Sequence, residues 1–100
     1  MDNLTVIDNP PESRFEARSD DGAIVGFVAY DARAGGAGVV VVTHTVVEPE
    51  FEGRGVGGRL ARGALDLIRA SGSEVVPLCT FVAAYIERHP DYADLVRKVH

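Results

Sequence analysis

The sequence predicts a mixed α/β (α+β) fold in which a mostly antiparallel sheet gains one parallel strand pair and carries two main helices. Three observations lead to this prediction. The β-branched run Val39–Val47 is typical of a buried strand, apolar residues recur at helical spacing over Val56–Ala70, and residues 74–78 form a second short apolar run. A helix between two such strands implies a right-handed crossover, which makes the strands parallel neighbours.

The N-terminal part of the chain predicts antiparallel strands. Residues 4–7 and 14–18 have strand-like composition and are separated by the break Asn9-Pro10-Pro11. Asp20-Asp21-Gly22 is a hairpin turn signal that leads into a third strand at residues 23–30. These short runs are therefore expected to pair before the valine-rich strand joins them.

The C-terminal part predicts two main helices and a short third one. The first helix buries one apolar face and ends at Gly72, and the second covers residues 81–88 with Thr80 as its cap and His89-Pro90 as its end. Residues 91–99 are expected to form a last short helix. The apolar face of the first helix consists of Val56, Leu60, Ala64, Leu67 and Ile68.

Composition limits the classes of function. The 100 residues are expected to form one domain, residues 1–100, because a chain of this length buries only one modest core. A net charge of −5 disfavours nucleic acid as a partner. No apolar stretch approaches the ~18 residues of a membrane span, so we expect no membrane association and a cytoplasmic location. The single cysteine, Cys79, cannot form an internal disulfide.

A glycine-rich turn joins the valine-rich strand to the first helix. It contains Gly53, Gly55, Gly57 and Gly58, which let the backbone approach a ligand closely. The first N–H groups of the helix have no internal partner, and the positive end of the helix dipole favours anions. The turn therefore predicts a phosphate-binding cradle, with Arg54 or Arg59 available to neutralise charge.

Two other phosphate-binding motifs fit the turn poorly. A P-loop would end its loop with Gly-Lys-Ser or Gly-Lys-Thr, whereas no lysine lies near this turn. A dinucleotide fingerprint requires an acidic residue at the end of the next strand, and Glu74 instead opens that strand.

The segment Val47-Glu48-Pro49-Glu50-Phe51, followed by Glu52-Gly53-Arg54-Gly55-Val56-Gly57, resembles the GNAT superfamily of acyl-CoA-dependent N-acetyltransferases. Residues 75–90 resemble a small single-domain subgroup of that superfamily. The resemblance covers about residues 39–96 and implies a minimal GNAT fold that moves an acetyl group from acetyl-CoA to a primary amine. Glu52 departs from the family pattern, which usually has Gln or Arg there, so a side-chain contact to the phosphate is in doubt.

The resemblance also implies where acetyl-CoA binds. Its pantetheine arm would lie where the valine-rich strand and the following parallel strand part, pairing with the backbone of Val46 and Val47 like an added strand. Relative to larger members, two helices that help wall the acceptor site are missing, so that site is open or is completed by a second copy or another protein. The expected cofactor-binding residues are Val46, Val47, Glu52, Gly53, Arg54, Gly55, Val56, Gly57, Gly58 and Arg59.

Three residues are candidates for catalysis. Tyr85 stands where the superfamily often places the tyrosine that protonates the departing thiolate, although it also fits a packing role. Cys79 follows the second strand, where it either accepts the acetyl group or simply lines the cleft. His44 shares a face with Val40, Val42, Val46 and Glu48 by period two, which points it into the core or the cofactor cleft. His44, Cys79 and His89 are too scattered for a metal site, and we predict none.

Two other functions stay open at this point. A CoA-binding or protein-interaction module would keep the cradle with little or no catalysis, and a structural partner of a larger complex would need neither. Cofactor binding separates the structural role from the other two, and turnover with amines separates an enzyme from a binding module.

Overall fold

Five strands form one sheet in the order β1-β2-β3-β4-β5 in the computed structural model, which describes residues 3–97. The first four strands pair antiparallel and β5 pairs parallel to β4, so the predicted sheet is confirmed. The strands are β1 (Thr5–Asn9), β2 (Arg14–Arg18), β3 (Ile24–Asp31), β4 (Val39–Val47) and β5 (Glu74–Pro77).

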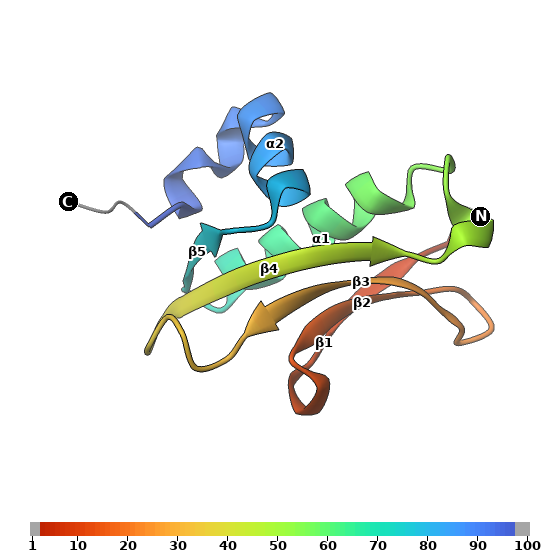
Figure 1. Ribbon diagram of the computed structural model, residues 1–100, viewed down its shortest axis with the longest axis horizontal. Coiled ribbons are helices and arrows are strands. Elements are labelled where there is room, and N and C mark those ends of the chain that lie inside the picture. The colour runs from red at the N-terminus through yellow and green to blue at the C-terminus, as the bar shows by residue number, and fades with distance from the viewer. Residues whose placement is uncertain (1–2, 98–100) are drawn as a thin grey trace.

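Two α-helices, α1 (Val56–Ala70) and α2 (Thr80–Arg88), lie on the same side of the sheet (Figure 1). Three short 3-10 helices, η1 (Pro10–Glu12), η2 (Pro49–Phe51) and η3 (Pro90–Leu95), connect the elements. The predicted bounds of the first helix are confirmed, and Gly72 follows its end with a φ of 75°. Its buried face consists of Val56, Leu60, Ala61, Ala64, Leu65 and Ile68.

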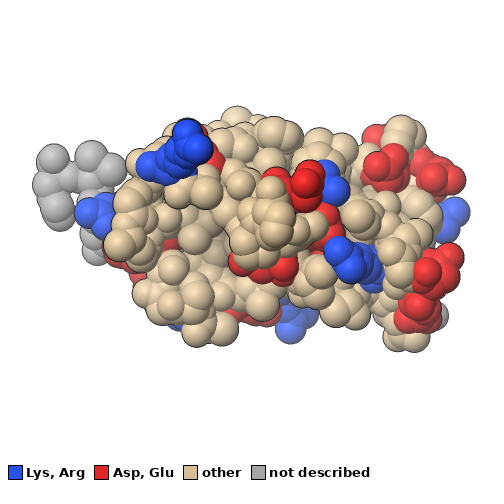
Figure 2. Space-filling model, turned by 90° about the horizontal axis from the view of Figure 1, so that it is seen from below, with Lys and Arg blue, Asp and Glu red and all other residues tan. Residues whose placement is uncertain are grey.

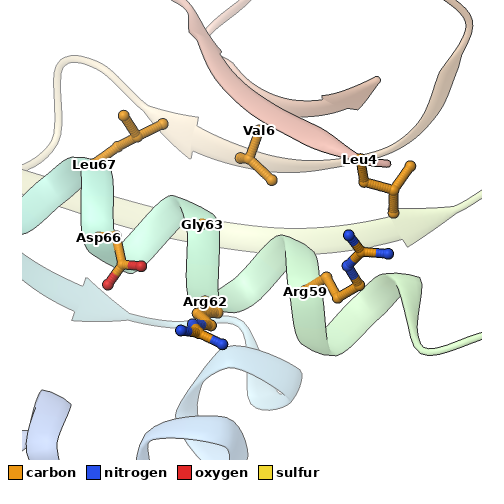
Figure 3. A pocket seen from close by; sticks show the side chains of 7 residues that line it. All are labelled: Leu4, Val6, Arg59, Arg62, Gly63, Asp66 and Leu67. Atoms are coloured by element: carbon orange, nitrogen blue, oxygen red, sulfur yellow. The ribbon is translucent and has the colours of Figure 1, made fainter. Parts of the chain in front are cut away.

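A glycine allows α1 to approach β1 closely. A Cβ atom added at Gly63 would lie 2.5 Å from Cγ2 and 2.6 Å from Cβ of Val6, distances that real contacts do not reach. Figure 3 shows Gly63 and Val6 on the two walls of a groove of about 380 Å³ between α1 and β1. The small residue therefore sets the spacing between the helix and the edge of the sheet.

Two local predictions for the C-terminal part are wrong. Thr80 is the first residue of α2 and Cys79 holds the cap position, because the N–H groups of Leu78 and Cys79 both donate to the Val42 carbonyl and keep Cys79 extended. The last helix is a 3-10 helix that ends at Leu95, since Val96 leaves it to form a bridge with Val75. Residue 99, the expected end of this helix, lies outside the described residues.

A bulge in β4 overturns the predicted position of His44. Tyr30 pairs with Val42 and Ala29 pairs with His44, so Thr43 is an extra residue that shifts the alternation of side chains by one. His44 therefore leaves the helix-covered face on which Val42 is buried. It lies exposed on the opposite face, where its ring meets Phe27 edge-on at 6.1 Å between centroids.

The face of the sheet away from the helices carries a buried ion-pair cluster. Glu16 is fully buried and accepts hydrogen bonds from Arg14 Nε at 2.7 Å, Arg18 Nη2 at 2.6 Å and Asn9 Nδ2 at 2.9 Å. The Arg14 guanidinium also lies 4.6 Å from the centre of the Phe27 ring. Figure 2 shows the molecule from below, the side away from the helices, where charged groups stand among a mainly uncharged surface.

The Glu16 cluster predicts a pH-dependent contribution to stability. Burial raises the pKa of Glu16, but hydrogen bonds from Arg18, Arg14 and Asn9 outweigh burial and lower that pKa from 4.5 to about 2. At pH 7, Glu16→Gln should lower the free energy of unfolding by about 1.5–3 kcal/mol, the range for hydrogen bonds to charged groups. Because the folded pKa is the lower one, this contribution is complete above pH 4.5 and disappears as the pH falls toward 2.

Denaturant unfolding of wild type and Glu16→Gln between pH 7 and pH 2 tests this expectation. The exposed Glu12, changed in the same way, is the control and should show no such difference. A wild-type advantage that stayed constant down to pH 2 would contradict the lowered pKa.

Candidate functional site

The candidate site begins where β4 and β5 part. The two strands pair from Val39 with Glu74 to Val42 with Pro77, and β5 then ends. Beyond Val42, β4 continues to Val47 and pairs with β3 on one side only, within the described residues. This unpaired edge offers backbone groups to an extended ligand.

The glycine-rich turn places free backbone donors at the start of α1. Gly53 and Gly55 have φ values of 78° and 77°, which glycine adopts without strain. The first hydrogen bond of the helix runs from the Arg59 N–H to the Gly55 carbonyl at 3.2 Å. Among residues 3–97, the N–H groups of Val56, Gly57 and Gly58 therefore have no hydrogen-bond partner.

A cavity of about 280 Å³ lies over these donors. A Cβ atom added at Gly55 or Gly58 would meet no atom within 4 Å, so both glycines face open space that a phosphate group could fill. The residues of the turn thus fit an anion in shape and in hydrogen bonding. The cavity is lined by Val47, Phe51, Glu52, Gly53, Gly55, Val56, Gly57, Gly58 and Phe81.

Charges around this cavity are mixed. Glu52 lines it, and its carboxylate opposes an anionic ligand. Arg54 stands over the Phe51 ring, 5.8 Å from its centre, whereas Arg59 extends from the first turn of the helix toward Leu4 (Figure 3). Backbone donors and Arg54 therefore have to offset Glu52.

Cys79 lies at the point where the strands part. Its Sγ is 3.3 Å from Oγ1 of Thr45 on the unpaired part of β4, and the cysteine is only 6% exposed. This contact connects the end of β5 to β4 across the cleft, so the structure brings Cys79 to the place where the sequence predicted it.

Tyr85 lies on the next turns of α2, with its ring stacked on His89 at 4.0 Å between centroids. The residue is 7% exposed, and none of its buried polar atoms lacks a hydrogen-bond partner. Tyr85 is six residues beyond Cys79, about 9 Å of helix rise. Its ring contacts are with His89 and with Tyr92, 6.2 Å away between centroids, so the structure does not bring Tyr85 into contact with Cys79.

His44 faces away from both residues. Its neighbour Thr45 points toward Cys79, so His44 projects to the other face of β4. The Thr43 hydroxyl donates to the Ala29 carbonyl at 3.3 Å and can then accept from Nδ1 of His44, also at 3.3 Å. This arrangement places the proton on Nδ1 and leaves Nε2 with its lone pair.

Sequence reasoning missed two residues of the site. Thr45 and Phe81 border the cleft, and Phe81 is 39% exposed. Phe81 also packs against Gly57, where an added Cβ atom would lie 2.9 Å from its Cζ. The available signal was Phe81 itself, an apolar residue at the start of α2 that does not belong to the buried face formed by Val82, Tyr85 and Ile86.

Comparison with known proteins identifies the family. The chain matches the family model of the GCN5-related N-acetyl-transferases over residues 14–95, and it therefore belongs to this family of acyltransferases. A search of curated proteins found no match.

Two solved structures share the fold. One is the solution structure of a protein assigned as a GCN5-like N-acetyltransferase from Staphylococcus aureus, with a TM-score of 0.67 and 22% identity over 100% of this chain and 94% of that one. The other is a crystal structure of a protein assigned as a phosphinothricin N-acetyltransferase, with a TM-score of 0.56 and 19% identity. The match covers 78% of this chain and 53% of that protein, so this chain spans about half its length.

Two features are absent from residues 3–97. Within residues 3–97, no cluster of three or more His, Cys, Asp or Glu side chains is arranged to hold a metal ion. None of the helices in this part of the chain combines the length and the apolar character that crossing a membrane requires.

Proposed function

We propose that the protein transfers an acetyl group from acetyl-CoA to a primary amine. The observation that carries this proposal is the path from the free N–H groups of α1 to the unpaired edge of β4, with Cys79 and Thr45 at its inner end. Acetyl-CoA supplies an acyl group that is already activated as a thioester. The protein then has to bind it, exclude water and move two protons.

The cradle would hold the pyrophosphate. The N–H groups of Val56, Gly57 and Gly58 donate to its oxygens, with the helix dipole adding to the attraction. Arg54, over the Phe51 ring, offsets the Glu52 carboxylate. The backbone of Val46 and Val47 pairs with the amides of the pantetheine arm, which fills the place that β5 leaves vacant.

His44 is the base in this proposal. Its Nε2 accepts the proton that the amine loses as nitrogen forms its bond to the acyl carbon, while Nδ1 stays bound to Thr43. Tyr85 donates its hydroxyl proton to the sulfur as the carbon–sulfur bond breaks. His44 and Thr45 project from opposite faces of β4, so the amine enters from the sheet face that the helices leave uncovered.

A cavity of about 430 Å³ beside His44 fits such an amine. Glu12 and Asp31 contribute carboxylates to its wall, which favour a cationic alkylammonium, and Arg33 limits the net charge. A second copy or another protein that completes this open site stays a prediction, as does the cytoplasmic location. The cavity is lined by Glu12, Ser13, Ala29, Tyr30, Asp31, Ala32, Arg33, Thr43 and His44.

A charge placed in the cradle should block binding. Gly55→Asp puts a carboxylate where the pyrophosphate lies, and Gly55→Asn is its matched control, because both side chains tolerate the left-handed backbone at φ 77°. Isothermal titration with CoA should show a Kd at least about tenfold higher for Asp than for Asn, since one poorly screened charge contact exceeds 1.4 kcal/mol. Equal Kd values in two folded variants would place the phosphate elsewhere.

Removing the Tyr85 hydroxyl should affect chemistry and spare binding. Tyr85→Phe is expected to lower kcat by ~10²-fold or more, the usual value of general acid catalysis, with the Kd for CoA unchanged. The ring remains to stack on His89, so the thermal stability of the variant should match wild type. A kcat equal to wild type would limit Tyr85 to packing.

Cys79 separates two routes of transfer. We propose direct transfer to the amine, in which Cys79 only lines the cleft beside Thr45, so Cys79→Ala should keep most of the turnover. In a two-step route the thiolate would take the acetyl group first, and acetyl-CoA without amine would add one acetyl mass to the protein. An adduct that forms and discharges at least as fast as turnover, and is lost with turnover in Cys79→Ala, would overturn direct transfer.

One observation favours a second candidate function. The sheet face on the His44 side carries no α-helix within residues 3–97, so only strands, η1 and the loop after β3 wall the cavity there. A CoA-binding or protein-interaction module with little catalysis would have this form. Turnover with a panel of primary amines distinguishes the two, because such a module binds CoA without forming acetylated product.

A further inference from the structure

The two outer edges of the sheet differ in how they are covered. Along β5, Val96 forms a bridge with Val75, and the Arg97 N–H donates to the Val75 carbonyl at 2.9 Å. Pro77 then ends that strand. Along β1, within residues 3–97, no strand or bridge lies on the side away from β2. Natural sheets protect such an edge with lysine, proline or a bulge, and Thr5–Asn9 has none of these.

The backbone of β1 directs hydrogen-bonding groups away from the sheet. The Tyr30 N–H donates to the Ser13 carbonyl at 3.0 Å, which continues the β2–β3 ladder, and hydrogen-bonded pairs alternate along such a ladder. The even-numbered residues of β2 therefore direct their backbone groups to β1, where they meet the odd-numbered residues. The N–H and carbonyl groups of the even-numbered residues of β1, Val6 and Asp8, consequently point to the open edge.

An apolar groove of about 380 Å³ lies beside this edge. Leu4, Val6 and Leu67 line it, and all three are only partly buried where they pack against the core. Figure 3 shows Leu4 and Val6 on one wall and Leu67 on α1, on the other. A strand added to β1 would direct every second side chain to the helix-covered face, over this groove.

We propose that a second copy of this chain pairs with β1, antiparallel about a two-fold axis at Val6. The edge is self-complementary in that register, because Val6 meets Val6 and Leu4 meets Asp8, so no like charges stand opposite each other. An axis at Asp8 would instead set two carboxylates opposite each other and bring Pro10 into the ladder. The pairing makes one continuous sheet, and Leu4 and Val6 of the second copy cover the groove of the first.

Charges along α1 match the same axis. Gly63 packs on Val6, so an axis at Val6 passes beside Gly63 as well. Arg59 stands four residues before Gly63 and Asp66 three residues after it, both on the side of α1 that lines the groove. In an antiparallel copy, each Arg59 therefore lies across from the second copy's Asp66. That carboxylate keeps its charge while it accepts the hydrogen bond from Tyr92, and opposite charges across an interface favour this orientation.

Hydrogen exchange of the wild-type protein tests the pairing. At a concentration where light scattering gives twice the chain mass of 10.7 kDa, the amides of Val6 and Asp8 should exchange at least about tenfold more slowly than in a sample diluted to monomer. The amides of Thr5 and Ile7, which bond to β2, should be protected in both samples and are the internal control. Fast exchange at Val6 and Asp8 in a dimer would overturn the proposal. A mass of one chain at every concentration would overturn it too and leave this edge to a different protein.

Two variants separate backbone pairing from side-chain packing. Val6→Pro removes the outward N–H at the centre of the pairing, and the β2 ladder keeps its bonds because that N–H takes no part in it. Val6→Ala is the matched control, which keeps the N–H and loses more of the side chain. Sedimentation should give a monomer for Val6→Pro, with the circular dichroism of wild type, and a dimer for Val6→Ala. The same mass for both folded variants would overturn pairing through the backbone of β1.

Discussion

The site depends on the early end of the pairing between β4 and β5. Pro77 is the last residue of β5, and proline has no N–H group with which to continue a ladder. The next two N–H groups, those of Leu78 and Cys79, both turn back to the Val42 carbonyl, after which the chain enters α2. The rest of β4 therefore pairs with β3 along one edge and has no partner strand along the other.

Close packing brings the other parts of the site to this edge. Gly26 lets β3 and β4 lie under Leu60 of α1, because a Cβ atom there would be 2.8 Å from the Val46 carbonyl and 3.4 Å from Leu60. Gly63 does the same for β1, and Gly57 lets Phe81 of α2 come close to the first turn of α1. The N-termini of both helices therefore converge near the end of β4, where the free N–H groups, Cys79 and the cavity lie.

Much of this arrangement could be predicted from the sequence, because strong local signals agree with it. Apolar residues recur at helical spacing over Val56–Ala70, and Gly72 follows the end of that helix. The glycine-rich turn before it is typical of a phosphate-binding site. The position of His44 could not be predicted. The residues from Val39 to Val47 are nearly all good strand formers, so no glycine or other change in composition indicates the bulge at Thr43. The Glu16 cluster was missed for a related reason. Arg14, Glu16 and Arg18 alternate as on a solvated strand face, and only the fold shows that Phe27 and the arginines bury the carboxylate.

The most direct test of the account is a map of where CoA binds. In an NMR titration of isotope-labelled protein with CoA, the amide signals of Val56, Gly57 and Gly58 should shift most, together with those of Val46 and Val47 on the free edge of β4. The first three residues carry the N–H groups that have no partner within residues 3–97, and the last two lie on the part of β4 that pairs on one side only. Shifts concentrated instead in the groove between α1 and β1, around Val6 and Gly63, would contradict the account.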